Sequence, residues 1–239
     1  MSASLGEVII LAGGFGTRLR KVVSDVPKPM APIDDNGTPF LALVMSQLAK
    51  QGITRVILSV GYMADVIQDY FGIKFEGMAI DYAVEDMPLG TGGAIKKAME
   101  ICHSDYVFVL NGDTYLDVPL EGIREIHKKS GADFTLAARE MSDFDRYGVL
   151  TLDERDRVLR FGEKEYCEHG YINGGVYCLQ RDLLEDMKED AFSLEKDFLE
   201  ARVEQLYIQA YKTKGYFIDI GIPADYLRAK SDFASGKFN

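Results

Sequence analysis

The sequence is poor in the residues on which several common classes of protein depend. Among its 239 residues there is no tryptophan, and there are only three cysteines and three histidines. The cysteines, Cys102, Cys167 and Cys178, are odd in number and far apart, which argues against a disulfide scaffold or a zinc site. No histidine lies in a motif for nucleophilic catalysis, so a Ser-His-Asp hydrolase has no support.

Long apolar runs are missing as well. No stretch approaches the roughly eighteen consecutive apolar residues of a membrane-spanning helix. The first residues do not show the basic, apolar and small-residue order of a secretory signal. With few cysteines and neither kind of segment, we expect a cytoplasmic protein without a membrane partner.

Positive charge is scarce too. The 27 lysines and arginines are outnumbered by 38 aspartates and glutamates, which gives a formal net charge of −11. A nucleic-acid partner would require a basic face, so none is expected. If the substrate carries phosphates, the overall field repels it, and the site must supply local cations such as arginine, lysine and a metal ion.

What the sequence does contain is a distinctive opening, VIILAGGFGTRLR, at residues 8–20. Its apolar start is typical of a strand buried on both faces. The glycines that follow, Gly13, Gly14 and Gly16, favour a loop that closes around an anion, although such turns are also common as purely structural features. Arg18 adds positive charge. The spacing matches neither a Walker A loop nor the dinucleotide fingerprint, which disfavours a P-loop NTPase and a nicotinamide-dependent dehydrogenase.

The hydrophobic pattern predicts one α/β domain over residues 1–239, with a Rossmann-like, mainly parallel mixed sheet flanked by helices. Apolar runs predict strands at 8–11, 55–60, 78–85, 105–113, 132–139, 147–153, 157–164 and 170–179. Helices are predicted from Thr38, as a cap, to Gly52, at 64–72, from 91, at 181–188, at 195–204 and from 223. Ligands of such sheets bind beyond the carboxyl ends of the strands.

Seven motifs carry a resemblance to a known family. They are LAGGFGTRLRKVVSDVPKPMAPI (11–33), EDMPLGTGGAI (85–95), LNGDTY (110–115), YGV (147–149), FGEK (161–164), INGGVY (172–177) and IDIGIPADY (218–226). In this order, over nearly the whole chain, the sequence resembles the sugar-1-phosphate nucleotidyltransferases, but it lacks their left-handed β-helix extension. The resemblance implies a GT-A-like nucleotidyltransferase fold and a reaction of a nucleoside triphosphate with a sugar 1-phosphate that releases pyrophosphate.

The resemblance also implies roles for individual residues. Arg18, Lys28 and Lys164 would stabilise the reacting phosphates. Asp113 and Asp219, each at a strand end, would hold Mg²⁺, which prefers one or two carboxylates together with phosphates and waters. The nucleotide-binding set would be Leu11, Gly13, Gly14, Gly16, Thr17, Glu85, Gly90, Thr91 and Asp113. The sugar-phosphate-binding set would be Gly148, Glu163, Lys164, Asn173 and Gly174.

Two acidic residues bear on the choice of base. Glu85 or its neighbour Asp86 precedes the segment that lines the base pocket in this family. A carboxylate only accepts hydrogen bonds, and guanine offers two adjacent donors, so GTP is favoured over UTP or dTTP. The alternative is that both acids belong to a solvated turn. The whole pattern most resembles guanylyltransferases acting on D-glycero-α-D-manno-heptose 1-phosphate, which supply GDP-heptose for bacterial surface polysaccharides.

Several alternatives stay open at this point. Threonine is usual after the DIG motif, whereas Ile222 stands here, and the tryptophan often found before that motif is absent. These departures leave GDP-mannose and UDP- or dTDP-glucose synthesis as alternatives. A noncatalytic regulatory relative is a further one, although the charged residues of the motifs are intact. The sequence leaves the oligomeric state open, homo-oligomers included.

Overall fold

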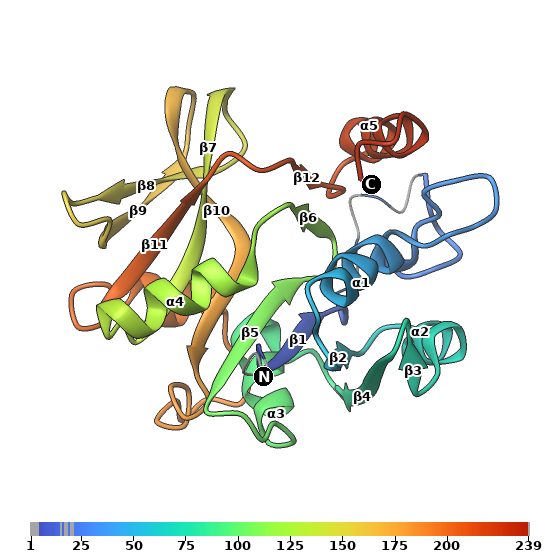
Figure 1. Ribbon diagram of the computed structural model, residues 1–239, viewed down its shortest axis with the longest axis horizontal. Helices are drawn as coiled ribbons and strands as arrows, with labels where there is room; N and C mark the ends of the chain where they lie inside the picture. Colours follow the sequence, from blue (N-terminus) through green and yellow to red (C-terminus); the bar gives the residue numbers. More distant parts are fainter. Residues whose placement is uncertain (1–4, 15, 17–18, 20–21, 239) are drawn as a thin grey trace.

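A ten-stranded sheet organises the fold (Figure 1). The computed structural model describes residues 5–14, 16, 19 and 22–238. The strand order is β11-β7-β10-β5-β1-β2-β4-β3, with β8 pairing with β10 and β9. These strands are β1 (Glu7–Leu11), β2 (Arg55–Val60), β3 (Lys74–Phe75), β4 (Met78–Val84), β5 (Tyr106–Asn111), β7 (Phe134–Phe144), β8 (Gly148–Leu152), β9 (Val158–Lys164), β10 (Cys167–Gln180) and β11 (Ile208–Thr213). A separate antiparallel pair consists of β6 (Thr114–Leu116) and β12 (Phe217–Asp219).

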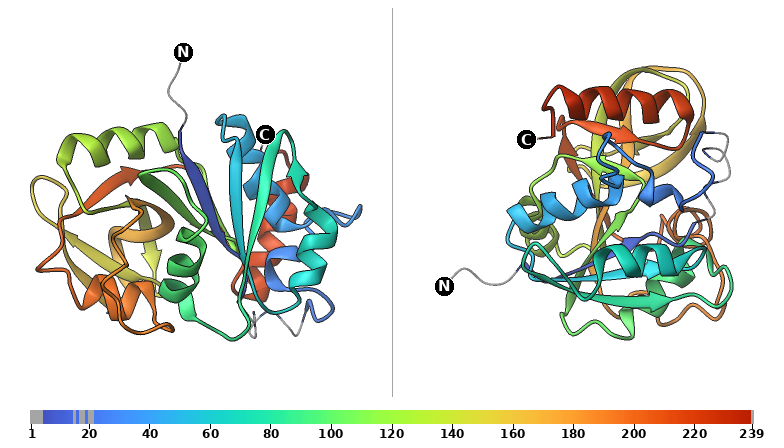
Figure 2. Two further views of the ribbon diagram at one scale, coloured as in Figure 1. Left: turned by 90° about the horizontal axis from the view of Figure 1, so that it is seen from below. Right: turned by 90° about the vertical axis from the view of Figure 1, so that its right-hand side faces the viewer.

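Helices cover both faces of the sheet (Figure 2). They are α1 (Phe40–Lys50), α2 (Ala64–Phe71), α3 (Gly90–Met99), α4 (Leu120–Ser130) and α5 (Pro223–Ala234), with the short helical segments η1 (Lys28–Met30) and η2 (Leu194–Glu200). Among the described residues, none of these helices has the length and apolarity to cross a bilayer.

The central strands feed two hydrophobic cores, one on each face of the sheet. In β1, Val8 and Ile10 pack into the core under α1, α2 and α5, and Ile9 packs into the core under α3 and η2. The other central strands alternate in the same way. Successive side chains of a strand point to opposite faces, so a sheet covered on both sides requires continuous apolar runs. This explains why the strands read as unbroken hydrophobic stretches.

The carboxyl ends of the parallel strands gather the candidate site residues at one edge of the sheet. Strands β5, β1, β2 and β4 run parallel, and β1 leads into the glycine loop while β4 leads to Glu85. Strand β10 runs antiparallel to β5, its Val176 lying opposite Leu110 near the end of that strand. The register between β10 and its other neighbour, β7, shifts between Asn173 and Tyr177. Strand β10 therefore brings the INGG motif to the edge where LNGD also lies.

The structure confirms the mixed α/β sheet and its predicted strands, and it corrects several helices. Residues 181–188 were predicted to be helical, but they contain only turns and coil, because their local backbone hydrogen bonds join residues three apart, not four as in an α-helix. The predicted helix at 195–204 is the shorter η2. Thr38 does not cap α1, since its hydroxyl donates to Asp34 at 2.8 Å and the cap position is Pro39. Helix α4 was not predicted.

The glycines of LGTGGA at the start of α3 allow a neighbouring segment to pack closely. The backbone N–H of Gly92 donates to the carbonyl of Phe192 at 2.9 Å, and the N–H of Phe192 donates to Leu89 at 2.9 Å. A Cβ on Gly92 would overlap the Phe192 ring, and a Cβ on Gly93 would overlap the carbonyl oxygen of Asp190. The motif thus fixes residues 190–194, and with them η2, against α3.

We predict that Gly93→Ala destabilises the protein by about 1–3 kcal/mol, because the added methyl must displace a backbone carbonyl in packed surroundings. Urea denaturation would measure the change in the free energy of unfolding. Gly131→Ala is the comparison, since Gly131 has a left-handed φ of 65° and no described atom within 4 Å of an added Cβ. Its cost is conformational only, about 1–2 kcal/mol. Hydrogen exchange at Gly92 should accelerate in Gly93→Ala alone, and unchanged exchange there would contradict this packing account.

Candidate functional site

Two adjoining cavities open at the carboxyl edge of the sheet. The first, of about 460 Å³, we call the loop cavity. It is lined by Leu11, Gly13, Gly14, Gly16, Lys28, Pro29, Glu85, Pro88, Gly90, Thr91, Ala94, Asn111, Asp113, Glu195 and Gly221. The second, of about 990 Å³, lies against the β8–β9 hairpin, and we call it the hairpin cavity. Asn111 and Glu195 line both cavities, so the two spaces meet at these residues.

All described members of the predicted nucleotide-binding set line the loop cavity, and the predicted sugar-phosphate set lines the hairpin cavity. Leu11, Gly13, Gly14, Gly16, Glu85, Gly90, Thr91 and Asp113 all contribute to the first, together with Lys28. Gly148, Glu163, Lys164, Asn173, Gly174 and Asp219 contribute to the second. Thr17 and Arg18 lie outside the described residues. Residues predicted from motifs far apart in the sequence are thus brought together in two groups.

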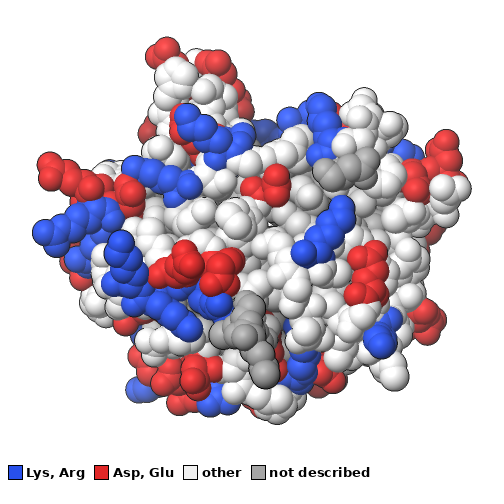
Figure 3. All heavy atoms as spheres, in the orientation of Figure 1, with Lys and Arg blue, Asp and Glu red and all other residues white. Residues whose placement is uncertain are grey.

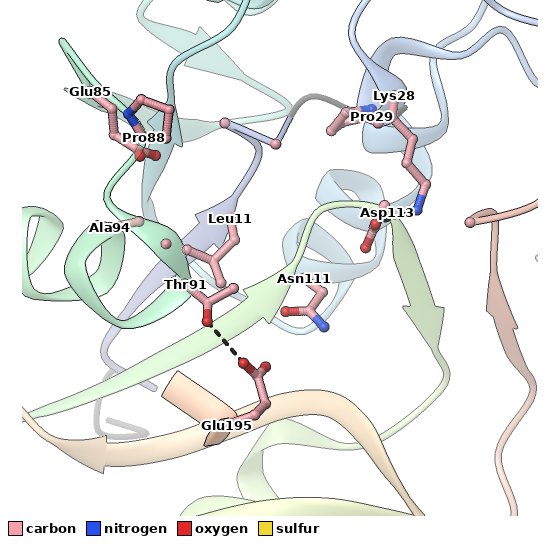
Figure 4. A pocket seen from close by; sticks show the side chains of 15 residues that line it. Leu11, Lys28, Pro29, Glu85, Pro88, Thr91, Ala94, Asn111, Asp113 and Glu195 are labelled. Carbon is pink, nitrogen blue, oxygen red and sulfur yellow. Dashed lines mark hydrogen bonds and ion pairs between the residues drawn. The ribbon is translucent and has the colours of Figure 1, made fainter. Parts of the chain in front are cut away.

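The ends of the loop cavity differ in chemistry (Figure 4). At one end, Glu85 and Pro88 face the cavity beside α3. The carboxylate of Glu85 accepts from the backbone N–H of Leu89 at 3.1 Å and from the Ser59 hydroxyl at 3.3 Å. An added Cβ on Gly13 would lie 2.5 Å from Glu85 Oε1, so glycine is needed at this position for the carboxylate to sit there. Asp86 does not line the cavity.

At the other end, one buried lysine lies between two carboxylates. The Lys28 side chain is only 9% exposed, and its Nζ forms an ion pair with Asp113 and lies 3.5 Å from Asp219 Oδ1. Proline on both sides of Lys28 and the short helix η1 hold this backbone in place. Gly16 has a left-handed φ of 56°, and a Cβ there would lie 2.6 Å from Lys28 Cβ. Lys28 is therefore a buried, ion-paired lysine and not a solvated surface residue.

Burial and charge repulsion act together on Asp219. Burial raises the pKa of its carboxyl above the usual range, and the nearby charge of Asp113 raises it further, while Lys28 and the N–H of Gly221 oppose this shift. The Gly221 N–H donates to Asp219 Oδ1 at 2.7 Å. Two carboxylates so close to one another are stabilised in the charged form by a cation between them.

The donor chemistry of this pair suits a hard divalent cation. Asp113 and Asp219 come from the ends of β5 and β12, and both reach the same lysine nitrogen. The described residues contain no group of three or more histidine, cysteine or acidic side chains that could enclose a metal. Magnesium does not need such a cage, because it keeps several waters and takes substrate phosphates as ligands. The two aspartates therefore fit Mg²⁺ bound jointly with a phosphate.

The hairpin cavity contains basic and polar groups suited to a phosphorylated, hydroxyl-rich ligand. Glu163 and Lys164 end β9, and Asn173 lies on β10. A Cβ at position 148 would overlap the carbonyl oxygen of Gly162. Glycine is therefore required at this position for β8 to pair with β9. Arg146 also lines the cavity and forms an ion pair with Asp225 of α5.

A chain of hydrogen bonds joins the walls of the two cavities. The Asn173 amide donates to the Tyr177 hydroxyl at 2.9 Å, and this hydroxyl lies 3.4 Å from Glu195 Oε1. The Thr91 hydroxyl donates to Glu195 Oε2 at 2.9 Å, which is the dashed contact in Figure 4. Asn111, Arg146 and Tyr177 were not predicted as site residues. Each lies inside or directly beside one of the seven family motifs. Their place in the cavity wall depends on how distant strands pair, which the sequence does not show.

The positive charge that matters for binding an anion lies within the cavities, whereas the protein as a whole is acidic. On the face shown in Figure 3, lysine and arginine side chains are scattered among aspartate and glutamate side chains. The net charge of −11 thus does not exclude an anionic ligand, provided that cations such as Lys28 and Lys164 lie within the cavities themselves.

Comparisons with known proteins agree with this geometry. The chain is 48% identical to D-glycero-alpha-D-manno-heptose 1-phosphate guanylyltransferase of Aneurinibacillus thermoaerophilus, over 95% of this chain and 97% of the relative. It is 45% identical to the protein of the same name from Campylobacter jejuni, over 92% and 96% of the two chains. Among solved structures, HddC from Yersinia pseudotuberculosis is similar with a TM-score of 0.84 and 41% identity, over 95% of this chain and 99% of that one. HddC has also been solved complexed with GMP-PN.

A sequence model of the family described as Nucleotidyl transferase matches residues 7–236, which includes both cavities and every strand. The agreement in sequence extends over nearly the full length of the relatives named above, and the agreement in structure covers 95% of this chain. The chain belongs to the nucleotidyl transferase family.

Proposed function

We propose that this protein transfers GMP from GTP to D-glycero-α-D-manno-heptose 1-phosphate, giving GDP-heptose and pyrophosphate. The observation that carries the proposal is the meeting of two cavities at Asn111 and Glu195, one lined by Lys28 and Asp113 and the other by Asp219 and Lys164. Relatives that are 45–48% identical over nearly their whole length carry this activity in their names. The fit of the heptose rests on those relatives.

The reaction needs positioning and charge stabilisation more than acid–base chemistry. A phosphate oxygen of the sugar 1-phosphate attacks the α-phosphorus of GTP. The new P–O bond forms as the bond from the α-phosphorus to the bridging oxygen breaks, and pyrophosphate leaves with that electron pair. The sugar phosphate is largely dianionic at pH 7, because its second pKa is about 6, so it requires no general base.

The residues divide this work between the two cavities. The nucleotide would lie along the loop cavity, with guanine at the Glu85 end and the phosphates at the Lys28 end. Gly13, Gly14 and Gly16 would bind the phosphates through the backbone, with Thr17 and Arg18 from the same loop, and Lys28 would offset their charge. Lys164 would hold the sugar phosphate, and Glu163 and Asn173 the sugar hydroxyls.

Asp113 and Asp219 would hold Mg²⁺ between protein and triphosphate. When bound there, the ion would neutralise phosphate charge that develops during the transfer. With the ion present, the two carboxylates would share a divalent cation in addition to the Lys28 ammonium group. This relieves the mutual repulsion of the carboxylates.

The substrate panel is the direct test of the proposed function. We expect GTP with heptose 1-phosphate and Mg²⁺ to give the highest kcat/KM for pyrophosphate release. GTP with mannose 1-phosphate should follow, because that sugar lacks only the terminal carbon, and one missing group in a pocket is worth about 1–3 kcal/mol. Preferred use of UTP or dTTP with glucose 1-phosphate would refute the assignment, and release with no pair would indicate a noncatalytic relative.

The metal proposal predicts losses in two separate variants. Asp113→Asn and Asp219→Asn should each lower kcat by about 10²–10³-fold, the cost of one lost electrostatic contact in a transition state. Both should raise the Mg²⁺ concentration needed for half-maximal turnover. EDTA should abolish turnover of the unmodified protein, and added Mg²⁺ should restore it. Asp117→Asn is the control, because Asp117 directly follows β6, the strand that pairs with β12, and lines neither cavity. Full activity of the double variant would rule out the site.

The role of Glu85 predicts a change in base preference. Glu85→Gln should reduce the ratio of kcat/KM for GTP over UTP by about tenfold to a hundredfold, the worth of a hydrogen bond to a charged group. Asp86→Asn is the control, because the Asp86 side chain is 94% exposed and pairs only loosely with Lys97, at 3.8 Å. An unchanged ratio in Glu85→Gln, or a change in Asp86→Asn alone, would show that Glu85 does not read the base.

A further inference from the structure

Glu195 stands at the junction of the two cavities, yet it belongs to none of the elements that build the main sheet. It comes from η2, and residues 190–194 hold η2 against α3 through the backbone bonds of Gly92 and Phe192. Of the described residues that line the loop cavity, only Glu195 and Asn111 also line the hairpin cavity. The Glu195 carboxylate therefore lies where ligand binding in one cavity can affect the side chains of the other cavity.

One donor reaches Glu195 from the loop cavity. The Thr91 hydroxyl, on the first turn of α3, donates to Oε2 at 2.9 Å. The Ser193 hydroxyl lies 3.2 Å from the same oxygen, but Ser193 lines the hairpin cavity. Thr91 Oγ1 itself accepts from the backbone N–H of Leu194 at 2.8 Å. Because that N–H occupies the oxygen of Thr91, the threonine proton is directed to Glu195.

A second donor reaches Glu195 from the hairpin cavity. The Tyr177 hydroxyl, 3.4 Å from Oε1, accepts from the Asn173 amide at 2.9 Å. The Tyr177 side chain is 1% exposed, and burial together with the charge of Glu195 raises the pKa of its hydroxyl well above the ordinary value, so the hydroxyl keeps its proton. The amide oxygen of Asn173 accepts from the Gly175 N–H at 3.0 Å, which fixes which end of the amide faces Tyr177.

Hydroxyl donors from both cavities, Thr91 and Tyr177, therefore reach the same acceptor, the Glu195 carboxylate. An ionised carboxylate can accept on both oxygens, whereas the amide of glutamine would present a donor to one of these two hydroxyls. The geometry points to Glu195 as a positioning residue that couples the two cavities: through Tyr177 it orients Asn173 for the sugar phosphate, and through Thr91 it is held by the nucleotide side. This inference rests on the proposed function of the two cavities.

The consequence is that the two ligands bind cooperatively. A nucleotide against α3 fixes Thr91 and with it the Glu195 carboxylate, so Tyr177 and Asn173 are already oriented when the sugar phosphate arrives. Binding of the second ligand then costs less conformational entropy, because these side chains are already ordered. By thermodynamic linkage, each ligand increases the binding affinity of the other by the same factor. Typical coupling factors of this kind are about 5–150-fold.

The experiment measures that factor directly by calorimetry. The probe is a GTP analogue with a methylene group between the α- and β-phosphates, which cannot release pyrophosphate. Its Kd is measured with Mg²⁺, alone and at saturating heptose 1-phosphate. We expect the unmodified protein to bind the analogue at least about fivefold more tightly in the presence of the sugar phosphate. In Glu195→Gln and in Tyr177→Phe, the ratio of the Kd measured alone to the Kd measured with the sugar phosphate should fall toward one. The double variant Tyr177→Phe/Glu195→Gln should show no further loss.

Conservative variants separate coupling from a merely structural role. Thr91→Ser keeps the hydroxyl and should keep the coupling, whereas Thr91→Val should lose it. Asp197→Asn is the matched control on the same helix, because the exposed Asp197 accepts only from the Ser193 N–H, at 2.7 Å, and lines neither cavity. It should retain the ratio of the unmodified protein even if its stability falls.

Two results would overturn the inference. One is a ratio of one in the unmodified protein. The other is an unchanged ratio in Glu195→Gln, whether or not that variant is less stable. The failure of the proposed function is a different result, namely no pyrophosphate release from GTP and any sugar 1-phosphate. If the unmodified protein turns over and Glu195→Gln keeps full coupling, only the inference about Glu195 fails.

Discussion

Burial of the sheet on both faces is the constraint from which the rest of the structure follows. A strand between two cores cannot carry polar side chains along its length without leaving them unpaired. The polar groups of this protein are therefore concentrated where the strands end. Asp113 follows β5, Glu85 follows β4, and the glycine loop follows β1. Because these strands run parallel, their ends share one edge, and the chemistry is assembled there.

The charge arrangement at that edge resolves the apparent conflict between an acidic protein and an anionic substrate. Asp113 and Asp219 place negative charge where a polyphosphate would lie, and Lys28 lies between them. The cluster is thus balanced in part without a ligand, and a divalent cation would complete that balance. Local compensation of this kind makes the net charge of −11 a poor guide to what the site binds.

The sequence allowed the sheet to be predicted well, since long two-sided burial leaves a plain signal in the apolar runs. It also allowed us to name most of the residues that line the two cavities, because glycine, lysine and aspartate stand at strand ends. The prediction of a helix at 181–188 was wrong. Apolar residues of this segment, such as Leu184 and Met187, are buried in the core under α3, but the backbone that carries them forms turns and coil. The role of Gly92 and Gly93 was not predictable either, since the partner that fills the space of their missing side chains lies about a hundred residues away.

Glu195 illustrates the same limit at the site. Its sequence neighbourhood, SLEKD, allows two interpretations, a place near the sugar pocket or simple helix capping by Ser193. The cap does exist, with the Ser193 hydroxyl accepting from the Lys196 N–H at 3.2 Å. What the sequence cannot show is that Tyr177 and Thr91, from two other elements, both reach the carboxylate. Long-range convergence on one acceptor leaves no local pattern.

The attachment of the β8–β9 hairpin has a consequence for how such a protein can diversify. Strand β8 pairs with β10 at a single position, Ile172 opposite Val149, whereas the hairpin carries Glu163 and Lys164 at the end of β9. One wall of the hairpin cavity is therefore built on a unit that contributes little to the pairing of the central sheet. Substitutions among its cavity-lining residues can reshape the hairpin cavity while the loop cavity keeps its geometry. Evolution can thus vary one cavity independently of the other, as long as Leu150 and Val158 of the same hairpin stay buried in the core.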